Sequence, residues 1–362
     1  MNYSYKTFFQ KLYQNQKKQY AFDSKTREEA LTWQREFRET LRKSLGLEQL
    51  EILASGLTEV PIVQEEVQED GYLRKKIVLE TLQDVFMPFY MLIPDGTDRK
   101  HPSRAMIAIP AHGANKNTVC GVGKTEEECA KIRSTPLECY GREFVRRGFV
   151  VFCPDPPGYG ERVEPIAGED RNFMPHYEKS SLDSSCKDLS ETAEAMGLSL
   201  TALEIWDLKR LLNYACSCPE VEWKEEDARI GCCGFSGGGQ YAMWLAALDD
   251  RVKTAIVSGY VHGYYDSILE YHLCPCNYAP GLWQLGDISD ICSLIAPRPL
   301  FIENGLGDVE NGPGGIEGPR KQVEKIRKAY EVWHAEVLLL HETPEGTHRW
   351  YGGGYKFAEN FL

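Results

Sequence analysis

The chain has 362 residues, of which 42% are hydrophobic and 26% are charged, which is typical of a globular protein with a large core. Its net charge of −13 argues against nucleic acid as the main partner, because phosphate binding needs a basic surface. We find no run of about 18 apolar residues and no apolar signal-peptide core, so we expect no membrane partner and a cytoplasmic protein. The 12 cysteines are scattered, which predicts reduced packing residues and no disulfide framework.

Residues 1–55 are predicted to form an N-terminal helical arm, because they are rich in charge and carry no strand pattern. Ser24 and Thr26 are candidate caps at the start of its main helix. The apolar positions on one helical face are Leu31, Phe37, Leu41 and Leu45. We expect this arm to pack against the body of the protein or to join two subunits in a homo-oligomer.

The remaining residues, 56–362, are predicted to form one α/β domain. Three short β-rich runs within 56–94 indicate an antiparallel edge. Apolar strands then alternate with helical segments such as 198–217 and 318–333, which predicts a mostly parallel central sheet with helices on both faces. The predicted strands of this part are 105–111, 149–155, 228–235, 252–259, 299–304 and 335–341.

Two segments break the alternation and are predicted to be insertions near an active-site cleft. Residues 161–195 are polar and resemble a loop, whereas residues 260–286 are rich in aromatic side chains. Long connections after strand ends are where open α/β sheets build their sites. We therefore expect Tyr260, Tyr264 and Trp283 to contribute to a substrate pocket.

The sequence GFSGG at 234–238 matches G-x-S-x-G, with an apolar strand before it and a helix after it. A sharp strand-to-helix turn projects its central side chain into the cleft, and the flanking glycines leave room for the crowded backbone. Ser236 is the predicted nucleophile. The neighbouring thiols of Cys232 and Cys233 are predicted to lie on opposite faces of the sheet, because strand side chains alternate.

A serine nucleophile needs a general base and an acid that orients it, in the chain order serine, acid, histidine for this architecture. His348 lies in a glycine-rich loop after the last strand and is the predicted base, with His341 as its rival. Asp308 follows the strand at 299–304 and is the predicted acid. Glu303, at the end of that strand, remains the alternative.

An oxyanion hole requires backbone N–H groups that point at the developing negative charge. Gly237, directly after the nucleophile, is one expected donor. The second should come from the loop that begins with His112 and Gly113, where we favour Ala114. His112 is also a candidate for substrate binding, as is Tyr159 in the stiff Pro-Pro-Gly-Tyr-Gly turn at 156–160.

Two further motifs are not predicted to bind ligands. GVGKT at 121–125 lacks the earlier glycine of a phosphate-binding loop and has no strand leading into it. HLCPC at 272–276 groups three potential metal ligands, but closed zinc sites usually pair separated ligand clusters, and no distant partner is evident. We therefore expect no metal and no cofactor.

Taken together, PAHG, PDPPGYGER, GFSGGG, APRPLFIENGLGD and GTHRW resemble the α/β-hydrolase superfamily, from about residue 80 to the end. Within it, the chain is similar to the acetyl-xylan-esterase-like and dienelactone-hydrolase-like branch. Dienelactone hydrolases use a cysteine nucleophile, whereas Ser236 stands at the elbow here. The resemblance implies an ester-cleaving enzyme with Ser236, Asp308 and His348 as its triad.

The sequence therefore predicts a serine esterase that acts on small-molecule esters with small acyl groups, among which acetyl esters of carbohydrates are candidates. A peptidase of the same fold would use the same residues. A binding protein built on an inactive hydrolase fold is the second alternative.

Overall fold

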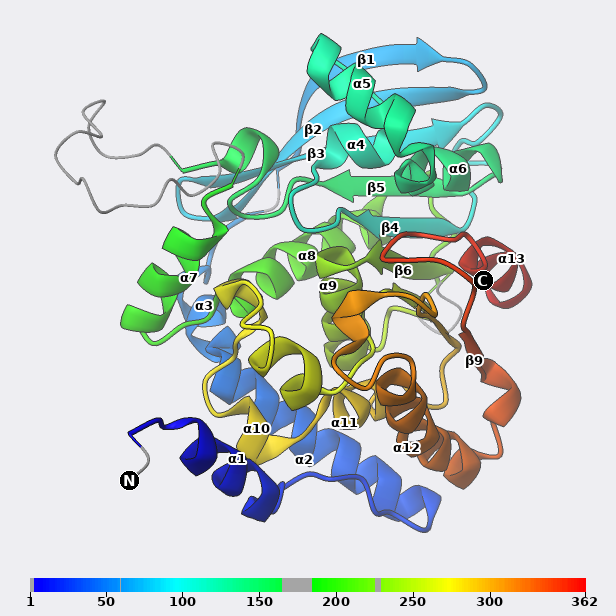
Figure 1. Ribbon diagram of the computed structural model, residues 1–362. Helices are drawn as coiled ribbons and strands as arrows, with labels where there is room; N and C mark the ends of the chain where they lie inside the picture. Colours follow the sequence, from blue (N-terminus) through cyan, green and yellow to red (C-terminus); the bar gives the residue numbers. More distant parts are fainter. Residues whose placement is uncertain (1–2, 59, 165–183, 225–228) are drawn as a thin grey trace, which may run out of the picture.

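The computed structural model describes residues 3–58, 60–164, 184–224 and 229–362. A single nine-stranded sheet runs through it, in the order β1-β2-β3-β5-β4-β6-β7-β8-β9 (Figure 1). The strands are β1 (Ile62–Glu69), β2 (Tyr72–Leu82), β3 (Val85–Pro94), β4 (Ala105–Ile109), β5 (Val150–Pro154), β6 (Ile230–Phe235), β7 (Thr254–Ser258), β8 (Leu300–Glu303) and β9 (Leu339–Glu342).

Strands β1 to β3 pair antiparallel with one another, and β3 pairs antiparallel with β5. From β5 onward every pairing is parallel. The predicted antiparallel edge and parallel centre are both confirmed. The last strand is shorter than predicted, because residues Glu336–Leu338 form a 3-10 turn before β9 begins.

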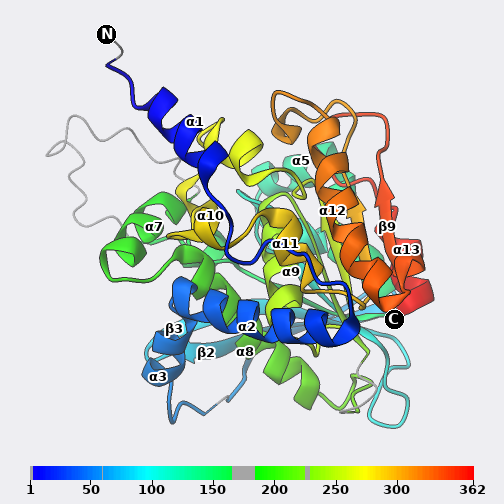
Figure 2. The same ribbon diagram turned by 90° about the horizontal axis from the view of Figure 1, so that it is seen from below.

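Helices cover both faces of the sheet (Figures 1 and 2). The α-helices are α1 (Lys6–Asn15), α2 (Arg27–Leu45), α3 (Leu47–Leu53), α4 (Lys116–Cys120), α5 (Glu126–Ser134), α6 (Tyr140–Arg146), α7 (Cys186–Ala195), α8 (Leu200–Ser217), α9 (Gly237–Leu248), α10 (Leu282–Leu285), α11 (Ile288–Ser293), α12 (Glu317–Trp333) and α13 (Gly354–Phe361). None of the helices in the described ranges is long and apolar enough to cross a membrane.

The two faces carry separate hydrophobic cores. Side chains of α2, α3, α8, α9, α11 and α12 form the larger core, and those of α4, α6 and α13 form the smaller one. Strand β6 supplies both, because Cys232 lies in the larger core and Cys233 in the smaller. The predicted alternation of these two buried thiols is confirmed, and neither faces the cleft.

The N-terminal arm is joined to the body through α2, which packs across α9 and α12 (Figure 2). Thr26 caps this helix, and its hydroxyl accepts a hydrogen bond from the N–H of Glu29 in a reciprocal capping box. Phe37 is fully buried and stacks on Tyr20 at 4.9 Å between ring centroids. Leu31, predicted on the same face, is instead 55% exposed.

The inserted segments contain more helix than the sequence predicts. Most of the loop predicted at 161–195 lies outside the described residues, but its last third is the helix α7. Polar helices without a strong apolar stripe are hard to distinguish from loops by pattern alone. The segment 260–286 holds a π-helical turn at Tyr264–Leu269, a 3-10 turn at Pro275–Asn277 and the short helix α10.

The packing of α2 predicts that the arm stabilises the whole domain. Replacing Phe37 by alanine should lower the free energy of unfolding by about 3–5 kcal/mol, because it empties a fully buried aromatic site. Leu31→Ala, on the exposed face of the same helix, should cost less than about 0.5 kcal/mol. Urea denaturation of the two variants measures the difference, and equal effects would show that α2 is not part of the cooperative core.

Candidate active site

Ser236 occupies a strained turn between β6 and α9. Its backbone has φ 55° and ψ −122°, a conformation that non-glycine residues rarely adopt and that is often retained at functional sites. The Ser236 N–H donates to the carbonyl of Ser258 on β7 at 2.9 Å. A Cβ on Gly234 would collide with the carbonyl of Gly238, and one on Gly238 would collide with that of Ile109. Both glycines of the motif are therefore required by close backbone contacts.

Three side chains from separate loops form a hydrogen-bonded chain beside this turn. The distance from Ser236 Oγ to His348 Nε2 is 2.8 Å, and that from His348 Nδ1 to Asp308 Oδ2 is 2.7 Å. Asp308 is buried, and its other oxygen accepts a hydrogen bond from the N–H of Glu310 at 2.8 Å. The structure thus brings together the three residues that the sequence predicts as nucleophile, base and acid.

The charges around His348 favour its protonated form. Burial opposes the imidazolium, but the hydrogen bond to Asp308 and the negative charges of Glu310 and Asp308 outweigh it and raise the pKa of His348. Glu310 Oε2 lies 3.5 Å from His348 Nε2. Burial raises the pKa of Glu310, although the charge of His348 opposes this. Glu310 was not predicted from the sequence, where its only signal is its place two residues after Asp308.

The two rival residues have other partners. Glu303 is fully buried and accepts hydrogen bonds from Ser258 Oγ at 2.7 Å and from the N–H of Tyr351 at 3.0 Å. This carboxylate therefore ties β7 to the loop that carries His348. His341 pairs with Asn304 Oδ1 at 3.3 Å, and burial lowers its pKa to about 4. Neither side chain is bonded to Ser236.

The structure does not support Ala114 as an oxyanion donor, because its N–H already donates to the carbonyl of Ala111 at 2.9 Å. His112 stands closer to the elbow. A Cβ built on Gly237 would lie 3.1 Å from the backbone nitrogen of His112, and no acceptor for the His112 N–H occurs among the described residues. The N–H groups of Gly237 and His112 are therefore the candidate pair beside Ser236. The sequence pattern alone does not show which of residues 112–114 offers a free backbone N–H beside Ser236, because this depends on how the loop turns.

A buried ion pair fixes the loop that contains His112. Lys116 Nζ lies 2.5 Å from Asp155 Oδ2 and 2.5 Å from Glu161 Oε1, and the Lys116 N–H donates to Asp155 Oδ1 at 2.9 Å. Asp155 and Glu161 flank the Pro-Pro-Gly-Tyr-Gly turn, so Lys116 ties this turn to the loop after β4. Replacing Lys116 by an apolar residue would leave the fully buried carboxylate of Asp155 without its cation.

A cavity of about 420 Å³ opens in front of Ser236 and His348. His112 and Tyr260, both predicted to bind substrate, line it. The lining residues that the sequence did not predict for the site are Ala111, Glu138, Phe235, Leu273, Cys274, Asn277 and Glu310. The cavity combines apolar walls with several polar groups, which suits a small polar ester.

The other three predicted aromatic residues lie away from this cavity. Tyr159 is buried behind His112, with 5.3 Å between the two ring centroids. Tyr264 and Trp283 line a different hollow beside α1, where Trp283 stacks on Tyr13 at 4.1 Å. Composition showed that the insertion is rich in aromatic residues, but only the path of the chain shows which ones face Ser236.

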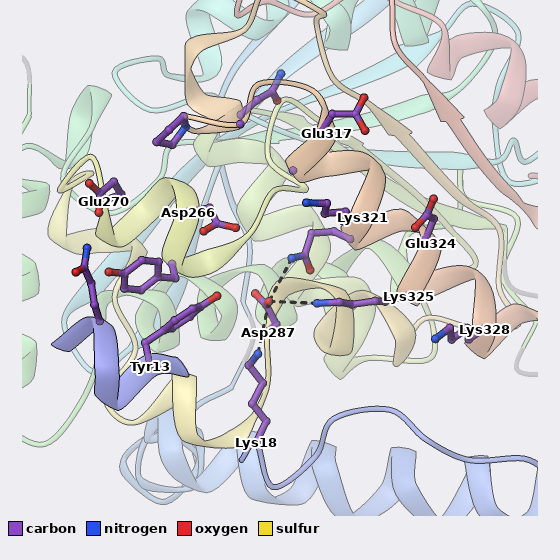
Figure 3. Close-up of a pocket in the computed structure, with 17 residues that line it drawn as sticks. Tyr13, Lys18, Asp266, Glu270, Asp287, Glu317, Lys321, Glu324, Lys325 and Lys328 are labelled. Carbon is purple, nitrogen blue, oxygen red and sulfur yellow. Dashed lines mark hydrogen bonds and ion pairs between the residues drawn. The ribbon is translucent and has the colours of Figure 1, made fainter. Parts of the chain in front are cut away.

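A larger cavity, of about 680 Å³, lies between α1, the π-helical turn and α12 and is not lined by Ser236, Asp308 or His348 (Figure 3). Lys18 and Lys325 each point at Asp287 Oδ2, with their Nζ atoms at 3.8 Å, and Gln322 donates to the same oxygen at 3.2 Å. Its lysines are interspersed with carboxylates, so it presents no uniform field to an anion. Asp287 thus links Lys18 of the N-terminal arm to Gln322 and Lys325 of α12.

Four side chains of types that can ligate metals also meet at the edge of the active-site cavity: His112, Cys186, Cys274 and Cys276. His112 and Cys186 are distant partners of the HLCPC segment that the sequence did not reveal.

Comparison with known proteins identifies the family of this chain. A family model described as "Abhydrolase family" matches residues 2–262. The "Putative hydrolase YtaP" of Bacillus subtilis (strain 168) is 27% identical over 254 residues, which cover 66% of this chain and 71% of that protein.

Two solved structures are similar in fold. A protein of Bacteroides fragilis NCTC 9343 described as a "putative acetyl xylan esterase" superimposes with a TM-score of 0.72 at 19% identity, covering 95% of this chain and 83% of its own. Acetyl Xylan Esterase 1 from Thermoanaerobacterium sp. JW/SL YS485 superimposes with a TM-score of 0.54 at 14% identity, covering 90% and 96%. The sheet order, the elbow and the family match lead to one conclusion: the chain belongs to the Abhydrolase family and has the α/β-hydrolase fold.

Proposed function

We propose that the protein is a serine esterase that cleaves small carboxylic esters through an acyl-enzyme. The observation that carries this proposal is the unbroken chain from Ser236 Oγ through His348 to the buried Asp308, with Ser236 held at the apex of a strained turn. The esterases among the structurally similar proteins support the choice of ester over other acyl substrates.

The first half of the reaction forms the acyl-enzyme. Ser236 Oγ attacks the ester carbonyl carbon while His348 Nε2 takes the hydroxyl proton. Asp308 keeps the imidazole in the tautomer that exposes Nε2 and stabilises the imidazolium that forms. The N–H groups of Gly237 and His112 bind the oxyanion. When the tetrahedral intermediate collapses, the C–O bond to the alcohol breaks and His348 returns the proton to the leaving oxygen.

The second half consumes one water molecule. His348 Nε2 takes a proton from the water, whose oxygen attacks the acyl carbon. When the bond between that carbon and Ser236 Oγ breaks, His348 returns the proton to Ser236 Oγ. The carboxylic acid leaves and the triad returns to its starting state. No step requires an electron or a group that the substrate, water and these residues do not supply.

The cavity supports a small acyl group. Its volume of about 420 Å³ must hold both sides of the ester bond, and Glu138, Asn277 and Glu310 offer polar contacts suited to an alcohol that carries hydroxyl groups. Acetyl esters of carbohydrates fit this description. The peptidase alternative uses the same triad but needs a groove for an extended chain, which the cavity geometry does not favour.

Hydrolysis of p-nitrophenyl esters from acetyl to octanoyl tests the proposal. We expect the highest kcat/KM on the acetyl ester and a loss of about 10⁴-fold or more in kcat for Ser236→Ala, because the nucleophile is removed. Equal rates for the two proteins would exclude Ser236. Cleavage of peptide amides without ester cleavage would favour the peptidase, and no reaction with any ester or with a serine-directed phosphonate would favour a binding protein.

The identity of the acid is tested by a pair of isosteric variants. Asp308→Asn should lower kcat by about 10⁴-fold, because an amide stabilises the wrong imidazole tautomer. Glu303→Gln keeps an oxygen that can accept the hydrogen bonds from Ser258 and Tyr351, so kcat should stay within about threefold of wild type. The reverse ranking, measured at saturating ester, would make Glu303 the acid.

The charge of Glu310 predicts a shift in the pH profile. His348 acts as a base only when neutral, so kcat/KM should rise as pH increases through its pKa. Because Glu310 helps to raise that pKa, Glu310→Gln should move the rising limb of the profile to lower pH. Glu345→Gln, which removes an exposed carboxylate on the His348 loop, serves as the matched control and should not move it. An unchanged limb in Glu310→Gln would show that this carboxylate does not act on His348.

A further inference from the structure

Four side chains, one imidazole and three thiols, meet beside the active-site cavity, and these are the types of side chain that bind soft divalent metals most readily. His112 comes from the loop after β4, Cys186 is the first residue of α7, and Cys274 and Cys276 flank Pro275 in the inserted segment after β7. Their ligand atoms all lie within 4.8 Å of one another. His112 is separated from Cys186 by 74 residues, and Cys186 from Cys274 by 88.

We propose that His112, Cys186, Cys274 and Cys276 bind one zinc ion in a tetrahedral site of three thiolates and one imidazole. Zn–S bonds of about 2.3 Å and Zn–N bonds of about 2.0–2.1 Å place tetrahedral ligand atoms about 3.6–3.8 Å apart. The Cys186 Sγ is 3.4 Å from His112 Nε2 and 3.1 Å from Cys274 Sγ. Shifts of less than an ångström therefore separate these pairs from coordination distances.

The donor set selects the metal. Three sulfur atoms and one imidazole nitrogen, with no carboxylate in the cluster, favour zinc over the hard cations magnesium and calcium. Binding would release the thiol protons to solvent, leave the oxidation state of every sulfur unchanged and fill all four positions with protein ligands. A closed site of this kind is structural, because it leaves no coordination position for water or substrate.

Hydrogen bonds already hold the backbone of one ligand, Cys276, in place. The carbonyl of Cys276 accepts from Thr201 Oγ1 at 3.0 Å and from Gln240 Nε2 at 3.1 Å. Thr201 and Gln240 belong to α8 and α9, so the inserted segment is fixed to the main body of the fold. Such outer contacts orient metal ligands before the ion binds.

The cluster is partly enclosed by a small core of its own. Tyr159, Cys186, Leu200 and Cys276 are buried together, while Cys274 is half-buried. His112 is exposed on the side of the cavity. The ion could therefore enter from the cavity, after which the thiolates would hold it in an apolar surrounding that excludes water.

The zinc would fix the oxyanion loop. The imidazole of His112 faces the thiols, whereas its backbone nitrogen adjoins Gly237 at the elbow. One ion would therefore join the loop after β4, the start of α7 and the inserted segment around Ser236. This inference does not depend on ester hydrolysis, since the metal would serve as a clamp whatever acyl substrate is cleaved.

Metal analysis of the full-length chain tests the site. The protein, produced without a histidine tag and dialysed after zinc loading, should retain about one zinc per chain. Cys276→Ser should retain less than about one fifth of that amount, whereas Cys129→Ser, which alters a partly buried cysteine outside the cluster, should retain all of it. Ser236→Ala should also retain zinc, which separates this result from the fate of the esterase proposal.

Cobalt substitution identifies the ligands without relying on affinity. The Co²⁺-loaded wild type should show the strong visible absorption of tetrahedral cobalt and a thiolate-to-metal charge-transfer band in the near ultraviolet. Cys276→Ser, if it still binds cobalt, should lose about a third of the charge-transfer intensity, since two of three thiolates remain. Wild-type protein that is folded and binds neither metal would overturn the proposal, as would peptide mass spectrometry that finds a Cys186–Cys274 disulfide in the purified chain.

Discussion

The active site depends on one close approach of backbones at the carboxyl end of β6. Gly238 lies against the carbonyls of Ile109 and Pro110, and Gly234 lies against Gly238, so that no side chain fits at either position. This contact forces the chain to turn at Ser236 and holds the residue in a conformation that costs on the order of 1–3 kcal/mol. The surrounding sheet and α9 supply the packing that maintains it.

The same contact brings the loop after β4 next to Ser236. Because β4 and β6 are parallel neighbours, their carboxyl ends lie together, and His112 reaches Gly237. The loops after β8 and β9, also on this edge, deliver Asp308 and His348. The site is thus assembled from connections whose starting points are fixed by the sheet, which is why parallel α/β folds place chemistry at this edge.

Local sequence patterns were sufficient to predict the elements whose position follows from the pattern itself. Apolar runs located the central strands, G-x-S-x-G located the elbow, and the chain order led to Asp308 and His348, which the structure joins to Ser236. The failures have a common cause. Ala114, Tyr264 and Trp283 were placed from composition and proximity in sequence, whereas their roles depend on which way a loop turns. The contact of Glu310 with His348 and that of His112 with Cys186 join segments that are distant in the chain. No local sequence pattern predicts such contacts.

The central claim, that Ser236 carries the acyl group, is tested most directly by trapping the intermediate. The protein would be mixed with an acetyl ester, quenched in acid within its first turnovers and digested for peptide mass spectrometry. We expect one acetyl group on the peptide that contains Ser236, localised to the serine oxygen, and none on Cys232 or Cys233, which lie in the two cores. An acetyl group on another residue, with Ser236 unmodified and the ester turned over, would contradict the account.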